Sequence, residues 1–190
     1  MSEIRLAING FGRIGRITFR ALLKKRNITV VAINDLTDPH TLAHLLKYDS
    51  VHGNFPGTVE AGSDYLLVNR KKIRIFAEAE PGAINWGKLG IDVVIESTGR
   101  FTDKVSAMKH ITAGAGKVII SAPAKADHDD VKYIVIGIND HIIEDSDVII
   151  SNSSCTTNCV APMIKVLDDL WGIQEGFITT VHSYTRDQNL

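Results

Sequence analysis

The sequence predicts an α/β fold in which a mainly parallel, doubly wound sheet is covered by helices on both faces. Short apolar segments of strand character alternate with segments of helical spacing through the first two-thirds of the chain, and this order is typical of parallel sheets. A glycine-rich turn joins the first strand segment to the first helical segment. The segment Ile28 to Ile33 is rich in β-branched residues, which favours a buried strand.

Four helices are predicted from apolar spacing and from residues that suit helix ends. Asp38-Pro39 and Thr102-Asp103 suit helix starts, and Gly172 suits a helix stop. The predicted helices run from Gly12 to Arg26, from Asp38 through Leu46, from Thr102 to about Ala113, and from Cys155 to Trp171.

The predicted strands are short, and two of them form a hairpin around Asn69-Arg70. The strands are Ile4 to Asn9, Ile28 to Ile33, Tyr65 to Val68, Lys72 to Phe76, Asp92 to Glu96, Val118 to Ser121, Tyr133 to Ile136 and Val148 to Ile150. A further β-rich segment, Phe177 to Tyr184, has no partner strand after it. We therefore expect one domain over residues 1–151 and the incomplete start of a second over residues 152–190.

Composition argues against several classes of protein. Apolar residues make up 44% and charged residues 23% of the 190 residues, as in ordinary globular proteins. A formal net charge of −1 gives no electrostatic reason for a nucleic-acid or membrane-surface partner. Neither a transmembrane span nor a secretory signal is expected. Two cysteines predict no disulfide framework and indicate a reducing, cytoplasmic compartment.

The turn NGFGRIG, residues 9–15, carries the spacing GxGxxG between a strand and a helix. Gly10 permits a tight turn, Gly12 lets a pyrophosphate approach the backbone, and Gly15 allows close packing of helix and strand. Asp35 ends the second strand, where a carboxylate accepts hydrogen bonds from ribose hydroxyls and repels a 2′-phosphate. The pattern favours a Rossmann-type NAD site over an NADP site. The alternative is that these glycines only form a turn and that Asp35 is a solvated loop residue.

Cys155 lies at the predicted start of a helix, where the dipole and free N–H groups lower a thiol pKa. Ser154, Thr156 and backbone amides could donate to a bound oxygen. His182 lies on the β-rich segment after the helix and could reach Cys155 as a base or as an imidazolium partner. The alternative is a helix cap with two incidental thiols.

The remaining cysteine and histidines indicate no further chemistry. Cys159 lies one helical turn beyond Cys155 and is expected to be a small buried side chain. The spacing CxxxC with one distant histidine falls short of a zinc site, so no metal is expected. The other six histidines show no usable arrangement.

Taken together, NGFGRIGR, NDLTDPHTLAHLLKYDSVHG, ESTGRF, KVIISAPAK, SNSSCTTNC and TTVHSYTRDQ closely resemble the phosphorylating, NAD-dependent glyceraldehyde-3-phosphate dehydrogenase family of glycolysis. The resemblance runs in order from residue 4 to the last residue. It implies a Rossmann domain, a separate α+β catalytic domain of which this chain holds only the opening helix and strand, and a homotetramer. It also implies that this chain alone has little or no activity.

The resemblance assigns roles to individual residues. Cys155 is implied to be the nucleophile, and His182 to activate its thiol. The implied cofactor contacts are Arg13 and Ile14 for the diphosphate, Asp35 for the adenosine ribose, Thr98 and Gly99 beside the cofactor, and Ser121 at the nicotinamide side. The implied phosphate-binding residues, for substrate and inorganic phosphate, are Ser154, Thr156 and Thr185. Ala79 departs from the family, which often has a basic residue there, so one contact to the adenine end is in doubt.

The implied reaction oxidises glyceraldehyde 3-phosphate through a cysteine thiohemiacetal and thioester, which phosphate converts to 1,3-bisphosphoglycerate. Erythrose-4-phosphate dehydrogenase shares most of these motifs and is one alternative. Aspartate-semialdehyde dehydrogenase fits less well, because its cysteine motif and NADP preference differ. A non-catalytic NAD-binding remnant is a third alternative, from a different class of function.

Overall fold

The computed structural model describes residues 3–125 and 131–183. Nine strands form one sheet within these residues. They are β1 (Ile4–Asn9), β2 (Ile28–Asn34), β3 (Val59–Ala61), β4 (Tyr65–Val68), β5 (Lys71–Phe76), β6 (Val93–Glu96), β7 (Lys117–Ile120), β8 (Lys132–Tyr133) and β9 (Ile149–Ser151). The helices are α1 (Arg13–Leu22), α2 (Pro39–Lys47), α3 (Lys104–Thr112) and α4 (Cys155–Trp171), with three 3₁₀ turns, η1 (Pro81–Ala83), η2 (Gly87–Leu89) and η3 (Asp140–Ile142).

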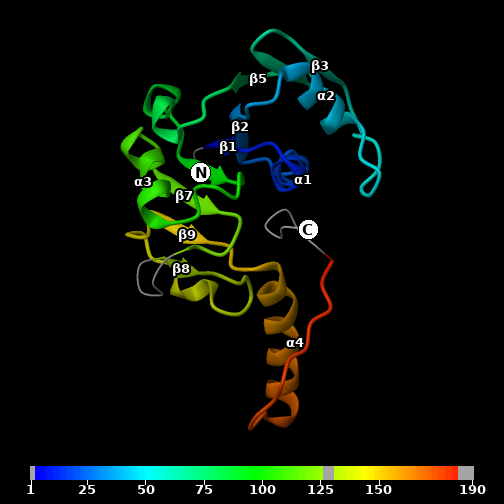
Figure 1. The fold of residues 1–190 in the computed structure, drawn as a ribbon, viewed down its shortest axis with the longest axis vertical. Helices are drawn as coiled ribbons and strands as arrows, with labels where there is room; N and C mark the ends of the chain where they lie inside the picture. Colours follow the sequence, from blue (N-terminus) through cyan, green and yellow to red (C-terminus); the bar gives the residue numbers. More distant parts are fainter. Residues whose placement is uncertain (1–2, 126–130, 184–190) are drawn as a thin grey trace.

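The strand order is β3-β4-β5-β2-β1-β6-β7-β9-β8 (Figure 1). Six neighbouring strands, in the order β5-β2-β1-β6-β7-β9, are parallel to one another. They follow the Rossmann order 3-2-1-4-5-6. The antiparallel pairs are β3 with β4 and β4 with β5. The prediction of a Rossmann-type, mainly parallel α/β fold is therefore confirmed.

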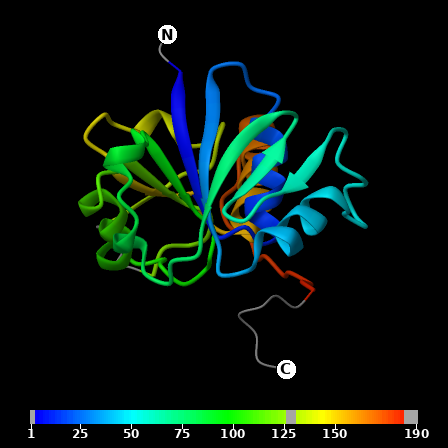
Figure 2. The ribbon, with the colours of Figure 1, turned by 90° about the horizontal axis from the view of Figure 1, so that it is seen from above.

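Helices cover both faces of the sheet. Successive residues of a strand point to opposite faces, so a strand that is apolar throughout must be covered on both. In β1, Leu6 and Ile8 enter one core cluster with Phe19 of α1. Ala7 enters the other cluster with Trp86 and with Ala107 of α3. Figure 2 shows α1 and α3 on opposite sides of the sheet. Strand β1 is thus buried on both faces from Leu6 to Asn9, as the near-continuous apolar sequence of this part requires.

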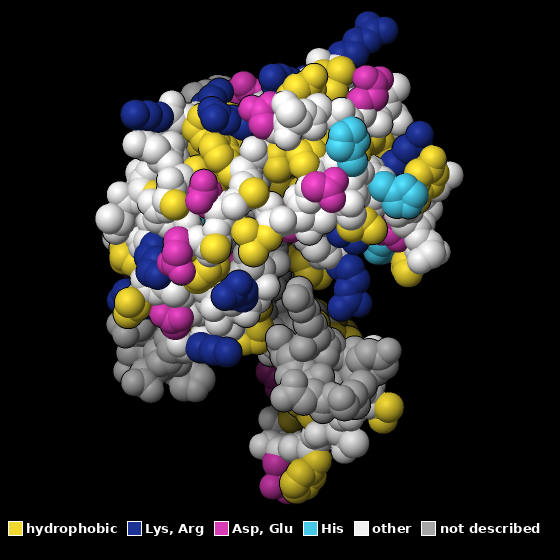
Figure 3. Space-filling model, turned by 45° about the horizontal axis from the view of Figure 1, so that its top comes forward, with side chains coloured by type: hydrophobic (Ala, Val, Ile, Leu, Met, Phe, Trp, Pro, Cys, Tyr) yellow, Lys and Arg dark blue, Asp and Glu magenta, His cyan; other side chains and the backbone are white. Residues whose placement is uncertain are grey.

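Helix α4 differs from the rest because it extends away from the sheet (Figure 1). None of its residues is buried, and it exposes large apolar side chains such as Met163, Leu170 and Trp171. Figure 3 shows basic and acidic side chains interspersed over the face in view, without an extended patch of one sign. No helix among the described residues is long and apolar enough to cross a membrane.

Several predicted boundaries shift by a few residues. Helix α1 ends at Leu22 rather than Arg26. Beyond its C-cap the backbone hydrogen bonds span three residues instead of four, with the N–H of Lys25 donating to the carbonyl oxygen of Leu22. Strand β8 has two residues rather than four, and the short edge strand β3 and the 3₁₀ turns were not predicted. The hairpin prediction is confirmed: Asn69 and Arg70 both have positive φ, which matches the twist of a two-residue hairpin turn.

The prediction of a long β segment from Phe177 is wrong for the part that the structure describes. Residues 177–183 form no strand, and Phe177 and Val181 are fully exposed. A strand needs a neighbour to satisfy its backbone donors and acceptors, and none of the described strands pairs with this segment. Tyr184 lies outside the described residues.

Helix caps give a first test of the fold. Asp103 caps α3 by accepting hydrogen bonds from the backbone N–H (2.8 Å) and hydroxyl (2.6 Å) of Ser106, and these bonds lower its pKa. We expect Asp103→Ala to lower the free energy of unfolding by about 1 kcal/mol, and Asp103→Asn to cost less because asparagine also caps. Because the folded-state pKa is the lower one, the wild-type advantage exists above about pH 4 and fades as pH falls through the folded pKa. Urea unfolding of the wild type and both variants at two pH values measures this difference. An equal loss of unfolding free energy in Asp103→Ala and Asp103→Asn contradicts it.

Candidate active site

The glycine turn places the start of α1 at the edge of the sheet without a side chain in front of it. Gly10 has a φ of +90°, and a Cβ atom there would lie 2.7 Å from the backbone nitrogen of Thr98. A Cβ on Gly15 would lie 2.1 Å from the carbonyl oxygen of Gly10. Gly12 is the N-cap residue, makes no side-chain cap, and has no atom within 4 Å of a Cβ position. The first N–H groups of α1 are therefore open to a phosphate.

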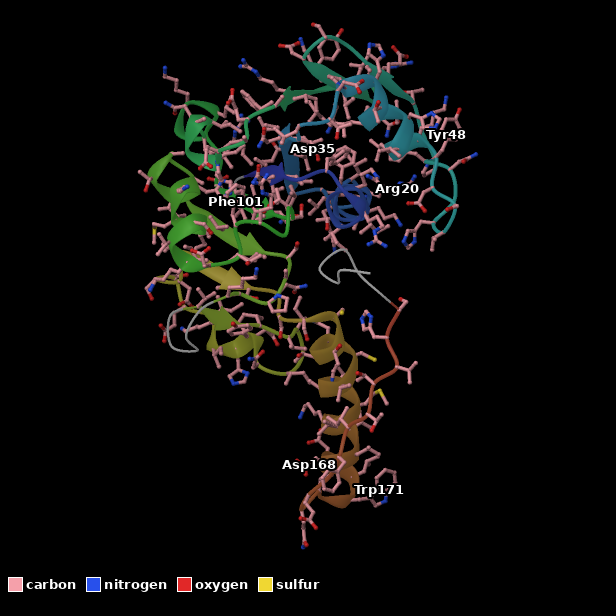
Figure 4. The ribbon with its side chains drawn as sticks, viewed as in Figure 1. Arg20, Asp35, Tyr48, Phe101, Asp168 and Trp171 are labelled. Carbon is pink, nitrogen blue, oxygen red and sulfur yellow. The ribbon has the colours of Figure 1, made fainter. Side chains whose placement is uncertain are left out.

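Asp35 follows β2 and connects the glycine turn to the next loop. Its carboxylate accepts hydrogen bonds from the backbone N–H of Phe11 (2.7 Å) and of Thr37 (2.9 Å). The side chain is half-buried, so further oxygen lone pairs remain open to a ligand. Figure 4 shows Asp35 and Phe101 in the upper part of the molecule, which contains the sheet, away from the far end of α4.

A cleft of about 260 Å³ lies beside this carboxylate. It is lined by residues from the ends of four parallel strands, β1, β2, β5 and β6: Gly10, Gly12, Asn34, Asp35, Leu36, Thr37, Glu78, Ala79, Ser97, Thr98, Arg100 and Phe101. The carboxyl ends of parallel strands are where doubly wound folds bind ligands. An open cradle at Gly12 and a half-buried carboxylate at Asp35 fit the diphosphate and ribose of a dinucleotide.

Four of the nine predicted cofactor residues line this cleft: Gly10, Gly12, Asp35 and Thr98. Arg13 and Ile14 are exposed in the first turn of α1, whereas Gly15 is buried against the turn. Gly99 has positive φ and is exposed directly after Thr98. Ser121 directly follows β7, and its N–H donates to the carbonyl oxygen of Glu96 (2.9 Å). The lining residues Glu78, Ser97, Arg100 and Phe101 were missed; the only signal for them was their position just after a strand.

The turn between β9 and α4 is held by short polar side chains. The Ser151 hydroxyl donates to the carbonyl oxygen of Ala122 (2.7 Å) and accepts from the backbone N–H of Ser153 (3.1 Å). Ser153 is buried and has a φ of +60°, which is uncommon outside glycine. The Asn158 amide donates to the carbonyl oxygens of Asn152 (2.8 Å) and Ser154 (3.0 Å). These bonds explain why serine and asparagine surround the thiol.

Cys155 is the first residue of α4, as predicted. Ser154 caps the helix by accepting from the backbone N–H of Thr157 (2.9 Å). The Cys155 thiol lies 3.2 Å from Nε2 of His182, and Nδ1 of the same ring donates to the carbonyl oxygen of Ser183 (2.5 Å). That bond fixes the proton on Nδ1 and leaves Nε2 facing the sulfur.

The two groups shift each other's pKa in the directions that favour an ion pair. The pKa of Cys155 is lowered, mainly by the hydrogen bond from His182, then by the charge of His182 and by hydrogen bonds from Thr156. The pKa of His182 is raised by its bond to the carbonyl of Ser183 and by its contacts with Cys155. A thiolate beside an imidazolium is a nucleophile with a proton donor at hand.

The other predicted residues around the thiol behave differently. Thr156 is half-buried and contributes to the lowered pKa of Cys155, whereas the Ser154 hydroxyl is engaged in the cap. The prediction that Cys159 is buried is wrong, because its thiol is exposed on a helix that packs against no layer of the fold. Thr185 lies outside the described residues.

A large apolar groove of about 960 Å³ runs along α4 from the thiol and imidazole. Its walls are one face of the helix and residues 173–182, and they include Val160, Ile164 and Leu167. Figure 4 shows Asp168 and Trp171 at the far end of this helix. No group of three or more His, Cys, Asp or Glu residues that could hold a metal occurs within the ranges 3–125 and 131–183.

The sheet order, the open glycine turn and the acidic residue after β2 define a protein of the dinucleotide-binding Rossmann class. Residues 4–104 match the family described as glyceraldehyde 3-phosphate dehydrogenase, NAD binding domain, and residues 154–190 match the C-terminal domain of the same family. The chain belongs to the glyceraldehyde-3-phosphate dehydrogenase family, and its cofactor is NAD.

The chain is similar to bacterial proteins named glyceraldehyde-3-phosphate dehydrogenase. It is 54% identical to the relative from Clostridium pasteurianum over 97% of this chain and 54% of the relative. Identity is 55% to the relative from Geobacillus stearothermophilus, over 98% of this chain and 55% of the relative. The relative from Thermotoga maritima is 54% identical, over 98% of this chain and 56% of the relative. The chain thus spans about half the length of the curated relatives that it matches.

The two thiols allow a direct test of the Cys155–His182 pair. We expect iodoacetamide to alkylate Cys155 faster than Cys159 at neutral pH, because the lowered pKa keeps more thiolate. In His182→Gln the pH at which the alkylation rate of Cys155 is half its maximum should rise toward about 8.5, the pKa of a free thiol. Peptide mass spectrometry over a pH series measures both rates, and Cys159 serves as the internal control. Identical pH profiles for the two cysteines would refute the pairing.

The glycine turn allows a matched pair of substitutions. Gly15→Ala should lower the free energy of unfolding by about 1–3 kcal/mol, because the added methyl group meets the Gly10 carbonyl. Gly12→Ala should leave stability nearly unchanged and weaken NAD binding about tenfold or more, since its methyl group enters only the open cradle. Urea unfolding and calorimetric titration with NAD separate the two effects. Unchanged stability in Gly15→Ala contradicts the packing argument.

Proposed function

We propose that this chain contributes the NAD-binding domain, residues 1–151, and the first part of the catalytic domain, residues 152–190, of a phosphorylating glyceraldehyde-3-phosphate dehydrogenase of glycolysis. The observation that carries the proposal is the contact of 3.2 Å between the Cys155 sulfur and Nε2 of His182 at the head of α4. Cys155 follows β9 by only a short turn, and β9 belongs to the sheet whose carboxyl edge carries the dinucleotide cleft.

In the proposed mechanism, the Cys155 thiolate attacks the aldehyde carbon of glyceraldehyde 3-phosphate. A carbon–sulfur bond forms, and the carbonyl oxygen takes a proton from the His182 imidazolium to give a thiohemiacetal. NAD, when bound, supplies the hydride acceptor for its oxidation. Neutral His182 receives the hydroxyl proton as the thioester forms. Attack by inorganic phosphate then breaks the carbon–sulfur bond, releases 1,3-bisphosphoglycerate and restores the thiolate.

The His182 environment suits both proton transfers. The Ser183 carbonyl holds the proton on Nδ1, so Nε2 is the atom that gives and receives protons opposite the sulfur. This bond also stabilises the imidazolium after each uptake. At the start of α4, the backbone N–H of Thr157 is engaged by the Ser154 cap, and that of Asn158 donates to the Ser154 carbonyl. The Thr156 N–H is hydrogen-bonded to the Cys155 thiol, so the proposed donor to a developing oxyanion is the Cys155 N–H.

The remaining residue roles follow from position. We propose that Gly10, Gly12 and Gly15 shape the diphosphate cradle, that Arg13 and Ile14 flank it, and that Asp35 binds the adenosine ribose. Ala79 lines the cleft beside Glu78 and offers no charge to the adenine end of the cofactor. The proposed positions beside the cofactor are Thr98 and Gly99, with Ser121 at the nicotinamide side. The proposed phosphate-binding residues are Ser154, Thr156 and Thr185.

We further propose a cytoplasmic homotetramer that acts on small phosphorylated substrates, without nucleic-acid or membrane partners. The exposed apolar groove along α4 supports a catalytic domain larger than the part described here. The 190 residues by themselves should therefore turn over little or no substrate.

A hybrid enzyme tests this proposal. Residues 1–190 are joined to the corresponding remainder of the Geobacillus stearothermophilus relative, and NADH formation is followed with glyceraldehyde 3-phosphate and phosphate. We expect turnover in the hybrid and little in the 190-residue chain. Cys155→Ser should lower kcat by about 10⁴-fold or more, because the nucleophile is lost, whereas Cys159→Ser should retain activity.

Three outcomes would count against the proposal. A hybrid that prefers erythrose 4-phosphate to glyceraldehyde 3-phosphate contradicts the proposed substrate. Full turnover by the 190-residue chain, or by the Cys155→Ser hybrid, contradicts the proposed role of the catalytic domain or of the thiol.

A further inference from the structure

A row of buried polar side chains crosses the sheet beneath the dinucleotide cleft. The Asn34 amide donates to Oδ1 of Asn9 (2.6 Å), and the Asn9 amide donates to Oε2 of Glu96 (2.5 Å). The same carboxylate oxygen lies 3.0 Å from Nε2 of His110, and the Trp86 indole lies 3.1 Å from Nδ1 of that ring. All five side chains are at most 5% exposed. Such a row is costly unless every member is satisfied.

The Trp86 indole can only donate, so it fixes the directions of the hydrogen bonds made by His110. Nδ1 of His110 must therefore accept, so the ring is neutral at this nitrogen and carries its proton on Nε2. Nε2 then donates to Glu96. The carboxylate receives two donors on Oε2, from Asn9 and His110, and needs no proton of its own.

The other carboxylate oxygen, Oε1 of Glu96, faces Thr98 at the cleft. It accepts from the Thr98 backbone N–H (2.8 Å) and from the Thr98 hydroxyl (2.5 Å). The Thr98 hydroxyl oxygen in turn accepts from the backbone N–H of Arg100 (3.1 Å). Its only hydrogen is thus committed to Glu96, and one lone pair remains. Towards the cleft, Thr98 is an acceptor and not a donor.

This arrangement also connects Thr98 to the glycine turn. The Ser97 hydroxyl lies 2.7 Å from the carbonyl oxygen of Gly10 and donates to it, and Gly10 has no room for a side chain against Thr98. A shift of the Thr98 backbone therefore displaces the turn that shapes the phosphate cradle.

We propose that Glu96 is a positioning residue for the dinucleotide. Its buried carboxylate, held by His110 and Trp86, fixes Thr98 as an acceptor that selects a hydroxyl or amide N–H of the cofactor and disfavours a phosphate oxygen. This inference rests on the proposed binding of NAD in the cleft.

A neutral amide cannot replace this carboxylate. Glutamine at position 96 has one accepting oxygen and one donating nitrogen. If the nitrogen faces Thr98, it meets the backbone N–H and forces the hydroxyl to turn. If it faces Asn9 and His110, it meets two donors, and Trp86 prevents the histidine from moving its proton. Each orientation disturbs an element that shapes the cleft.

The test is a double-mutant cycle on NAD affinity, measured by calorimetric titration of the 190-residue chain. We expect Glu96→Gln and Thr98→Val each to raise the NAD dissociation constant about tenfold, and Thr98→Ser to retain affinity. The double variant should bind about as weakly as either single variant, because both changes remove the same acceptor. Ile84→Val, in the same core as Trp86, is the control for a general loss of stability. Its affinity should stay unchanged.

The outcomes separate this inference from the proposed function. Wild-type protein that binds no NAD overturns both. Wild-type binding with unchanged affinity in Glu96→Gln, or additive losses in the double variant, overturns only the positioning role. If Glu96→Gln does not fold, equal affinity of Thr98→Val and wild type overturns the inference. Nitrogen-15 NMR of the wild-type His110 ring is an independent readout: a proton on Nδ1 at neutral pH contradicts the bond directions without reference to NAD.

Discussion

The close contact between the Gly15 backbone and the carbonyl oxygen of Gly10 is the constraint on which the rest of the site depends. There is no space for even a methyl group between them. Helix α1 consequently starts directly above the end of β1, and its free N–H groups point past Gly12 into the cleft. The Gly10 turn is also supported from outside, because Asp35 accepts from Phe11 and Ser97 donates to Gly10. Residues that face the ligand therefore also hold the turn in shape.

Strand order explains how distant parts of the chain meet at this turn. β2, β1, β6 and β7 are neighbours and parallel, so residues 35, 10, 98 and 121 all follow the same edge of the sheet. β9 extends that edge, and the short turn after it leads into Cys155. A Rossmann sheet thus offers both the cofactor site and the starting point of the thiol helix.

The parts of the fold that sequence could predict are those governed by local chemistry. A proline in a first turn, an aspartate at a cap and two turn residues between strands act on their own neighbours, and α2, α3 and the β4–β5 hairpin follow from them. The start of α4 at Cys155 was predictable for the same reason. These signals depend on nothing further away than one helical turn.

Features that depend on distant partners were not predictable. His110 showed no usable pattern in sequence, yet it is fully buried, because Trp86 and Glu96 satisfy both of its nitrogens. Residues 177–183 have β propensity but no neighbouring strand, and propensity alone does not satisfy a backbone. Burial of Cys159 would require a layer packed on α4. In each case the deciding partner lies outside the local segment.

The two halves of the proposed site differ in how solvent acts on them. The Glu96 row is sealed from water, so each of its bonds is strong and a missing partner would be costly. The Cys155–His182 pair is exposed, and its attraction is weakened by water and by dissolved salt. Geometry compensates in part: the helix start and the Ser183 carbonyl act at contact distance, where screening is least effective. Exposure also leaves the sulfur accessible to an aldehyde. A pair as deeply buried as Glu96 and His110 would be closed to a substrate.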